Sequence, residues 1–225
     1  MIKLVIFDLD DTLISEAEYV KSGYKVISKY IEEKFKINCS DTFEKLWSYF
    51  KNKEKDTFNK LLDEYQISYT KEDIVELVNV YRNHVPCIAF FDDVIPFLNE
   101  LKSRNIHTGI ISDGYLTTQK NKLEALEAYL KFDYIILTDE LGREYWKPNP
   151  KAFEMIMEKF NLKPEEIIYV GDNPKKDFYI KNFLPITTVR IVRENAVYAN
   201  EEYLEGIKED FRINKLINIL DFIKG

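Results

Sequence analysis

The chain has 225 residues, a net charge of -7 and 45% hydrophobic residues, enough apolar material for one large domain or one domain with an insertion. The acidic balance and the dispersed basic residues argue against binding to nucleic acid or to acidic membranes. Two cysteines are too few for a disulfide framework, and neither a signal peptide nor an apolar run of about 20 residues is found, so we expect a cytoplasmic protein.

The first strand is predicted over residues 2–8, because residues 4–7 form a continuous apolar run. Asp8, Asp10 and Asp11 follow at once. Carboxylates gathered at the end of a strand repel one another unless a proton or a cation intervenes, and magnesium prefers such oxygen ligands. Because open α/β sheets bind ligands at this edge, the N-terminus predicts a magnesium site with a carboxylate to spare for chemistry.

A succession of four amphipathic helices is predicted between residues 16 and 84, where apolar residues recur at helical spacing. Ser40 or Asp41 is expected to cap the second helix, and Thr70 with Asp73 resembles a capping box for the fourth. These helices predict a small bundle inserted after the first strand. The expected domains are therefore an all-α insertion, 16–85, and a core made of 1–15 and 86–225.

Strands and helices alternate after Pro86. The expected strands are 106–112, 132–138, 166–172 and 186–192, the expected helices are 94–103, 118–130, 150–160 and 174–183, and a short strand at 211–213 and a helix at 215–223 end the chain. Residues 194–209 show no clear pattern. The alternation predicts the α/β class, with a Rossmann-like parallel sheet that carries helices on both faces.

Polar residues stand where two of the later strands end. Ser112, Asp113 and Gly114 follow one strand, and Gly114 allows backbone N–H groups to face an anion at the start of the next helix. Asp172 ends another strand, and Asp177 is expected early in the helix that follows. Parallel strands present these groups at one edge of the sheet.

A lysine precedes another predicted helix. Lys147 stands in WKPNP, where Pro148 favours an extended conformation for the residue before it. Asn149 can cap the helix that Pro150 begins. Lys147 is therefore a candidate for a fixed cation.

Four of these segments together resemble the motifs of the haloacid dehalogenase superfamily of phosphohydrolases, which use an aspartate nucleophile. They are FDLDDTL at 7–13, IISDG at 110–114, KPNP at 147–150 and GDNPKKD at 171–177. They occur in the family's order, and the predicted helical insertion matches the family's cap. The resemblance implies a magnesium-dependent phosphatase for a small soluble phosphomonoester, working through an aspartyl-phosphate as a monomer or small homo-oligomer.

The resemblance also implies catalytic roles. Asp8 would be the nucleophile, Asp10 the general acid/base, and Lys147 the cation that neutralises the nucleophile and binds the phosphate. Magnesium would be held by Asp8, by the backbone carbonyl of Asp10 and by Asp172. Asp10 favours phosphoryl chemistry, because the dehalogenating branch of the family lacks an aspartate there.

The remaining motif residues receive binding or supporting roles from the same resemblance. Ser112, with the adjoining Asp113 and Gly114, would bind the phosphoryl group. Thr12 would support the site, and Asp177 would orient Lys147 or a metal-bound water.

Some alternatives stay open from the sequence. Many capped members of the family have glycine where this chain has Asp11, which weakens subfamily assignments but not the expected catalysis. The same core also suits a phosphomutase or another hydrolase of the family, and a non-catalytic binding module is a further alternative. His84 and His107 stand in no motif, and we interpret both as structural or surface residues.

Overall fold

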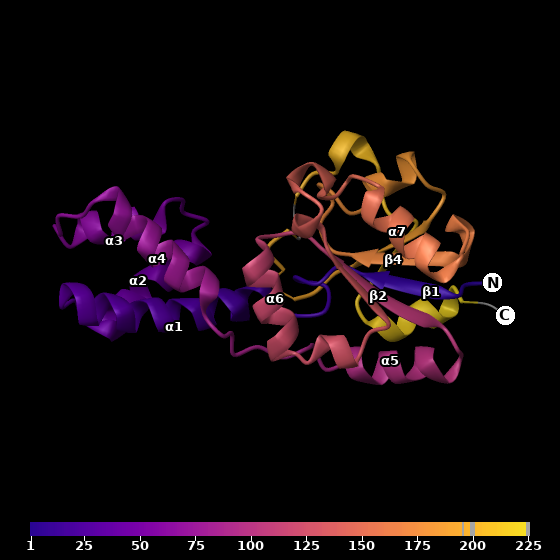
Figure 1. Ribbon diagram of the computed structural model, residues 1–225, viewed down its shortest axis with the longest axis horizontal. Helices are drawn as coiled ribbons and strands as arrows, with labels where there is room; N and C mark the ends of the chain where they lie inside the picture. Colours follow the sequence, from indigo (N-terminus) through magenta and orange to yellow (C-terminus); the bar gives the residue numbers. More distant parts are fainter. Residues whose placement is uncertain (195, 199–200, 224–225) are drawn as a thin grey trace. The chain divides into compact units, whose positions relative to one another are not determined.

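The computed structural model describes residues 1–194, 196–198 and 201–223. The chain divides into two compact units (Figure 1). The larger unit combines Met1–Ala17 with Ile88–Gly225, and the smaller unit is the continuous segment Glu18–Cys87. The boundaries expected from the sequence, after residues 15 and 85, lie slightly earlier in the chain.

The larger unit is built on a six-stranded sheet with the order β3-β2-β1-β4-β5-β6, in which every neighbouring pair is parallel. The strands are β1 (Leu4–Phe7), β2 (His107–Ser112), β3 (Tyr134–Leu137), β4 (Ile167–Gly171), β5 (Thr187–Ile191) and β6 (Phe211–Ile213). The predicted α/β class is confirmed. Most strands are shorter than expected because buried residues also lie beyond the paired backbone. Phe132, for example, is buried, but its N–H donates to Ala128 in a turn.

The larger unit also contains short helices. They are α5 (Val94–Ser103), α6 (Leu116–Ala125), α7 (Lys151–Phe160) and the 3-10 helices η1 (Ala128–Leu130), η2 (Thr138–Glu140), η3 (Arg143–Tyr145), η4 (Pro164–Glu166), η5 (Tyr179–Asn182), η6 (Leu204–Gly206) and η7 (Leu216–Asp221). The helix predicted over 118–130 is divided in two, because Glu127 takes a left-handed φ of 50° between α6 and η1.

Each face of the sheet carries its own apolar layer, because successive residues of a strand point to opposite faces. Val5 and Phe7 of β1 belong to the layer that includes α5 and η7, and Leu4 and Ile6 belong to the layer that includes α7. All four side chains are fully buried, as expected for a central strand of a parallel sheet. Figure 1 shows α5 and α7 on opposite sides of the sheet, so helices cover both faces as predicted.

The α-helix predicted over residues 174–183 is wrong. The side chains of Asn173 and Asp177 accept hydrogen bonds from the backbone N–H groups of Lys175 and Asn173, at 3.0 and 2.9 Å. Such side-chain bonds compete with helix formation, so Asp177 lies in a turn and only η5 follows.

The end of the chain also differs from the prediction. The helix expected over 215–223 is the 3-10 helix η7 instead. Within the segment 194–209, for which the sequence predicts no element, η6 forms, and positions 195, 199 and 200 lie outside the described residues.

The smaller unit is formed by four successive helices, of which the first begins just ahead of its boundary. They are α1 (Glu16–Phe35), α2 (Cys39–Lys51), α3 (Thr57–Glu64) and α4 (Lys71–Asn83). Ile27, Ile31, Leu46, Leu61 and Leu77 are fully buried, so the apolar faces predicted from the helical spacing form its core. Across the parts of the chain that the structure describes, no helix is both long and apolar enough to cross a bilayer.

One of the two predicted helix caps is correct. Thr70 and Asp73 form the expected capping box at α4. At α2 the cap is Asn38, whose side chain accepts a hydrogen bond from the N–H of Asp41 at 3.1 Å. The helix begins at Cys39, so the predicted caps, Ser40 and Asp41, lie inside its first turn.

Candidate active site

The predicted motif residues meet at the carboxyl edge of the central strands of the larger unit. Asp8 follows β1 directly, Ser112 is the last residue of β2, and Asp172 follows β4. The register pairs Phe7 with Val170, so Asp8 and Asp172, which follow neighbouring strands, differ by only one residue in register. This edge is where parallel α/β sheets bind their ligands.

Lys147 is the buried cation of the site. Its Nζ contacts Asp8 Oδ1, lies 3.0 Å from Asp177 Oδ1 and donates to the Tyr169 hydroxyl at 2.8 Å. Burial lowers the pKa of Lys147, but the Asp177 and Asp8 carboxylates outweigh burial and raise this pKa well above its ordinary value. Lys147 therefore carries a fixed positive charge beside Asp8.

Asp8, Asp172 and Asp177, which we call the three-aspartate cluster, are buried together. One carboxylate oxygen from each lies within 4.8 Å of the others. Burial raises the pKa of Asp8 to about 6 against the opposing attraction of Lys147. Burial, followed by the charges of Asp8 and Asp177, raises the pKa of Asp172 well above its ordinary value. A further positive charge beside Asp8 and Asp172 would therefore favour their ionised forms.

The free oxygens of this cluster fit a divalent cation. Asp172 Oδ2 is buried and has no hydrogen-bond partner among the described residues. Asp177 is already committed, because its Oδ1 accepts from Tyr169 and its Oδ2 accepts from the N–H of Asn173. The unused capacity lies on Asp8 and Asp172, and carboxylate oxygens are the ligands that magnesium prefers.

Asp10 is held by α6. Its Oδ1 lies 2.7 Å from Lys122 Nζ, and its Oδ2 accepts from Gln119 Nε2 at 3.0 Å. Burial tends to raise the pKa of Asp10, but Lys122 and Gln119 outweigh burial and lower this pKa. Lys122 also lies 2.9 Å from Glu16, whose pKa burial raises to about 8.

These α6 contacts were not predicted from the sequence. Gln119 and Lys122 are polar residues one turn apart, and Leu123 beside Lys122 is fully buried like them. The available signal for these contacts was the position of two long polar side chains on the apolar side of a predicted helix. Such residues are rarely buried without partners, so their position indicates a buried polar contact.

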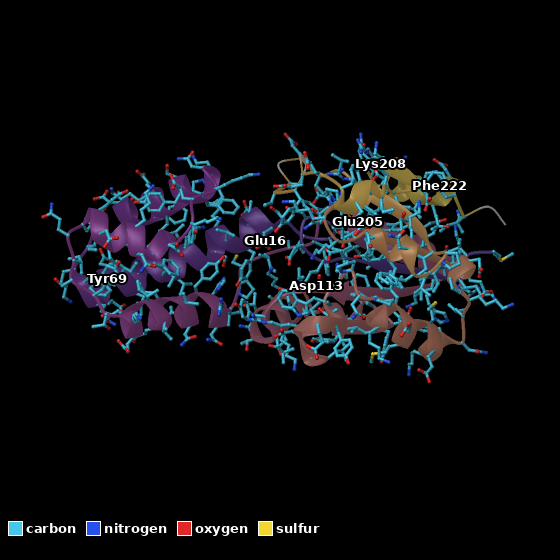
Figure 2. All side chains as sticks on the ribbon, turned by 90° about the horizontal axis from the view of Figure 1, so that it is seen from above. Glu16, Tyr69, Asp113, Glu205, Lys208 and Phe222 are labelled. Carbon is cyan, nitrogen blue, oxygen red and sulfur yellow. The ribbon has the colours of Figure 1, made fainter. Side chains whose placement is uncertain are left out.

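Asp113 connects the loops that surround the site. Its Oδ1 accepts from Thr138 Oγ1 at 2.8 Å and from the N–H of Lys147 at 3.1 Å, and its Oδ2 lies 3.1 Å from Lys176 Nζ. In Figure 2, Asp113 lies at the opposite end of the larger unit from Phe222. Burial tends to raise the pKa of Asp113, but Lys147 and Lys176 outweigh burial and lower this pKa.

Gly114 and Ser112 flank Asp113 and approach Gln119. Gly114 has a φ of 134°, and a Cβ there would lie 3.2 Å from the Gln119 side chain, so both backbone and space favour glycine. The Ser112 hydroxyl accepts from Gln119 Nε2 at 2.6 Å. Gln119 therefore connects Ser112 with Asp10.

The loop after Asp8 is braced from the far end of the chain. Arg193 donates to the carbonyl of Thr12 from Nε and Nη2, at 3.1 and 2.9 Å. Asp11 adopts a left-handed φ of 52°, and its carboxylate accepts from the N–H groups of Glu16 and Val197, at 3.0 and 2.7 Å. The Asp11 carboxylate therefore accepts two hydrogen bonds that a glycine at position 11 could not accept.

Comparisons with known proteins show the family of this chain. Residues 5–180 match the haloacid dehalogenase-like hydrolase family. The chain belongs to this family. It is 30% identical, over 231 residues, to the glyceraldehyde 3-phosphate phosphatase of Methanocaldococcus jannaschii, an alignment that covers 100% of this chain and 98% of the relative.

Two further similarities span the whole length of this haloacid dehalogenase-like hydrolase. The pyrophosphatase PpaX of Bacillus cereus is 25% identical over 230 residues, covering 100% of this chain and 97% of the relative. The crystal structure of a HAD phosphatase from Thermococcus onnurineus superposes with a TM-score of 0.64 at 23% identity, covering 100% and 99% of the two chains. That structural similarity supports the fold.

Proposed function

We propose that this hydrolase is a magnesium-dependent phosphatase that removes the phosphoryl group from a small soluble phosphomonoester through an aspartyl-phosphate on Asp8. The observation that carries the proposal is the contact of Lys147 with Asp8, beside Asp172 Oδ2, which has no hydrogen-bond partner among the described residues. The name of one relative, glyceraldehyde 3-phosphate phosphatase, supports a small phosphomonoester as substrate, and the pyrophosphatase name of another supports hydrolysis of a small phosphorylated compound.

In the proposed first step, a carboxylate oxygen of Asp8 attacks phosphorus while the bond from phosphorus to the leaving oxygen breaks. A carboxylate and a phosphate dianion repel each other, so their charge must be offset, and Lys147 is fixed in place to do this. Asp10, in its protonated form, donates its proton to the leaving oxygen, and as the resulting carboxylate it takes a proton from the water that hydrolyses the aspartyl-phosphate, which restores the protonated form.

Asp8, Asp172 and the backbone carbonyl of Asp10 would hold the magnesium ion. The bound ion would supply charge neutralisation for the nucleophile and the phosphate. Ser112 and the backbone around Gly114 would bind phosphoryl oxygens. Asp113 would act through Lys147 and Lys176, since its own oxygens already accept from these groups and from Thr138.

The proposal is tested by hydrolysis of p-nitrophenyl phosphate with and without magnesium. We expect magnesium-dependent turnover that Asp8→Asn abolishes, while the exposed Asp221→Asn leaves it unchanged. Turnover by Asp8→Asn equal to that of the unaltered protein would overturn the nucleophile assignment. Phosphoryl transfer to an added sugar phosphate in place of water would identify a phosphomutase instead.

A further inference from the structure

A lysine is buried on the side of α6 that faces the proposed acid/base. Lys122 is 2% exposed, and its ammonium group lies 2.7 Å from Asp10 Oδ1 and 2.9 Å from Glu16 Oε2. Burying a charged lysine costs several kcal/mol unless carboxylates pair with it. Asp10 and Glu16 supply that pairing, and Lys122 in turn fixes one oxygen of Asp10.

The two oxygens of Asp10 have different partners. Lys122 holds Oδ1, and Gln119 Nε2 donates to Oδ2 at 3.0 Å. The terminal torsion of an aspartate is soft, so one contact leaves the carboxylate plane free to rotate. A contact on each oxygen fixes that plane.

Gln119 also anchors this arrangement to the end of β2. Its amide nitrogen lies within hydrogen-bond distance of Asp10 Oδ2, of Ser112 Oγ at 2.6 Å and of the Asp113 carbonyl at 3.1 Å. An amide has two N–H bonds for these three acceptors. One acceptor is therefore always left to other donors, and Gln119 can keep Asp10 while Ser112 turns to a phosphoryl oxygen.

We propose that Gln119 and Lys122 are positioning residues for Asp10, which orient its carboxyl group so that the protonated form can protonate the leaving oxygen. This inference rests on the proposed function, because it takes Asp10 as the general acid. It adds the requirement that the efficiency of proton transfer depends on two side chains outside the family motifs. Loss of this positioning should slow substrates with poor leaving groups more than substrates with good ones, because a poor leaving group depends most on protonation.

The experiment compares kcat/KM for phenyl phosphate and p-nitrophenyl phosphate, which differ in leaving-group quality but little in size. For a double displacement, kcat/KM reports the steps up to departure of the leaving group. General acid catalysis contributes roughly 10²–10⁴-fold, so we expect Gln119→Met to lower kcat/KM for phenyl phosphate about tenfold more than for p-nitrophenyl phosphate. Lys122→Met should widen the ratio in the same direction.

The controls separate positioning from folding. Lys120→Met, on the same helix with its side chain 44% exposed, should leave the ratio unchanged. In an Asp10→Asn background, Gln119→Met should have no further effect on the ratio, because residues that act as a unit are not additive. Circular dichroism would show whether each variant is folded. If Lys122→Met, which removes a buried charge, does not fold, Gln119→Met tests the positioning role alone, because it leaves the charge of the site unchanged.

The outcomes are distinct. Equal losses on both substrates, or a ratio that Gln119→Met still widens in the Asp10→Asn background, would overturn the positioning role. Absence of magnesium-dependent turnover in the unaltered protein would instead overturn the proposed function, and the Asp8→Asn comparison detects that case.

Discussion

The hydroxyl of Tyr169 lies 2.8 Å from Asp177 Oδ1 and donates a hydrogen bond to it. The same hydroxyl accepts a hydrogen bond from Lys147. Tyr169 is fully buried in an apolar layer, with its ring edge-to-face against Phe153 at 4.8 Å between centroids. A core residue thus helps to set the position of the site cation.

Tyr169→Phe tests this relationship, because it removes one oxygen and keeps the ring packing. The substitution removes the hydrogen bonds of the hydroxyl with Lys147 and Asp177, and the loss of these buried partners should lower the free energy of unfolding by about 1–3 kcal/mol. We also expect lower kcat, because Lys147 loses one of its three contacts. Denaturant unfolding and steady-state kinetics measure the two effects, with Tyr134→Phe, at a partly exposed ring, as control. Unchanged stability would show that the hydroxyl contributes nothing to the buried network.

Gly171→Ala should disturb the same network from the other side. A Cβ at position 171 would lie 2.5 Å from Asp177 Oδ2, a separation that forces one of the two groups to move. We expect reduced stability of about 1–3 kcal/mol, as for other overpacked sites, together with reduced turnover. Thermal unfolding and p-nitrophenyl phosphate hydrolysis would measure these effects. Unchanged stability and unchanged turnover would contradict the close approach of Gly171 to Asp177.

The stability of the metal-free protein should depend on pH through Asp8. Its pKa is raised by burial to about 6, against about 3.9 in the unfolded chain. Between these values the folded state binds more protons than the unfolded state, so this carboxyl lowers the free energy of unfolding as pH rises through the window and exerts its full effect above it. The raised pKa of Asp172 acts in the same direction.

In the proposed function magnesium binds the ionised carboxylates of Asp8 and Asp172, so the ion should stabilise the protein more at about pH 7.5 than at about pH 5. Thermal unfolding with and without magnesium at the two pH values measures this difference. Asp172→Asn should remove most of the magnesium-dependent increase in Tm. Equal increases at both pH values would argue against a metal site built on these carboxylates.

Arg193→Met should weaken the loop that carries the proposed nucleophile. The guanidinium group binds the Thr12 carbonyl twice, pairs with Asp93 at 2.9 Å and lies over the ring of Phe91. Breaking a buried ion pair costs about 3–5 kcal/mol, and we expect a loss of stability toward the lower end. Arg104→Met removes an exposed pair with Glu100 and should cost less than about 1 kcal/mol. Similar losses in the two variants, measured by urea unfolding, would contradict the bracing role.

The sheet and the motif positions could be predicted from the sequence because their signals are local. Apolar runs such as residues 4–7 predict buried strands, and the edge where parallel strands end follows from the fold. The turn at Asn173–Asp177 could not be predicted in this way, because its helix-like composition is overridden by two side-chain hydrogen bonds.

The supporting network of the site depends on distant contacts. Tyr169 has the sequence pattern of a core strand residue. Its hydroxyl takes part in the site because it accepts a hydrogen bond from Lys147, which lies in another loop. Lys122 and Glu16 meet across a long stretch of chain. No periodicity or spacing connects such pairs, so they emerge only from the three-dimensional fold.

The central position of β1 also has a consequence for the order of assembly. Leu4 pairs with His107 on one side and with Ile167 on the other, so β1 leaves the ribosome long before either of its neighbours. Pairings between residues so far apart in the chain form slowly, whereas the helices of Glu18–Cys87 can form from local contacts. During synthesis, the proposed nucleophile Asp8 therefore lies beside an incomplete sheet until β4 has been made.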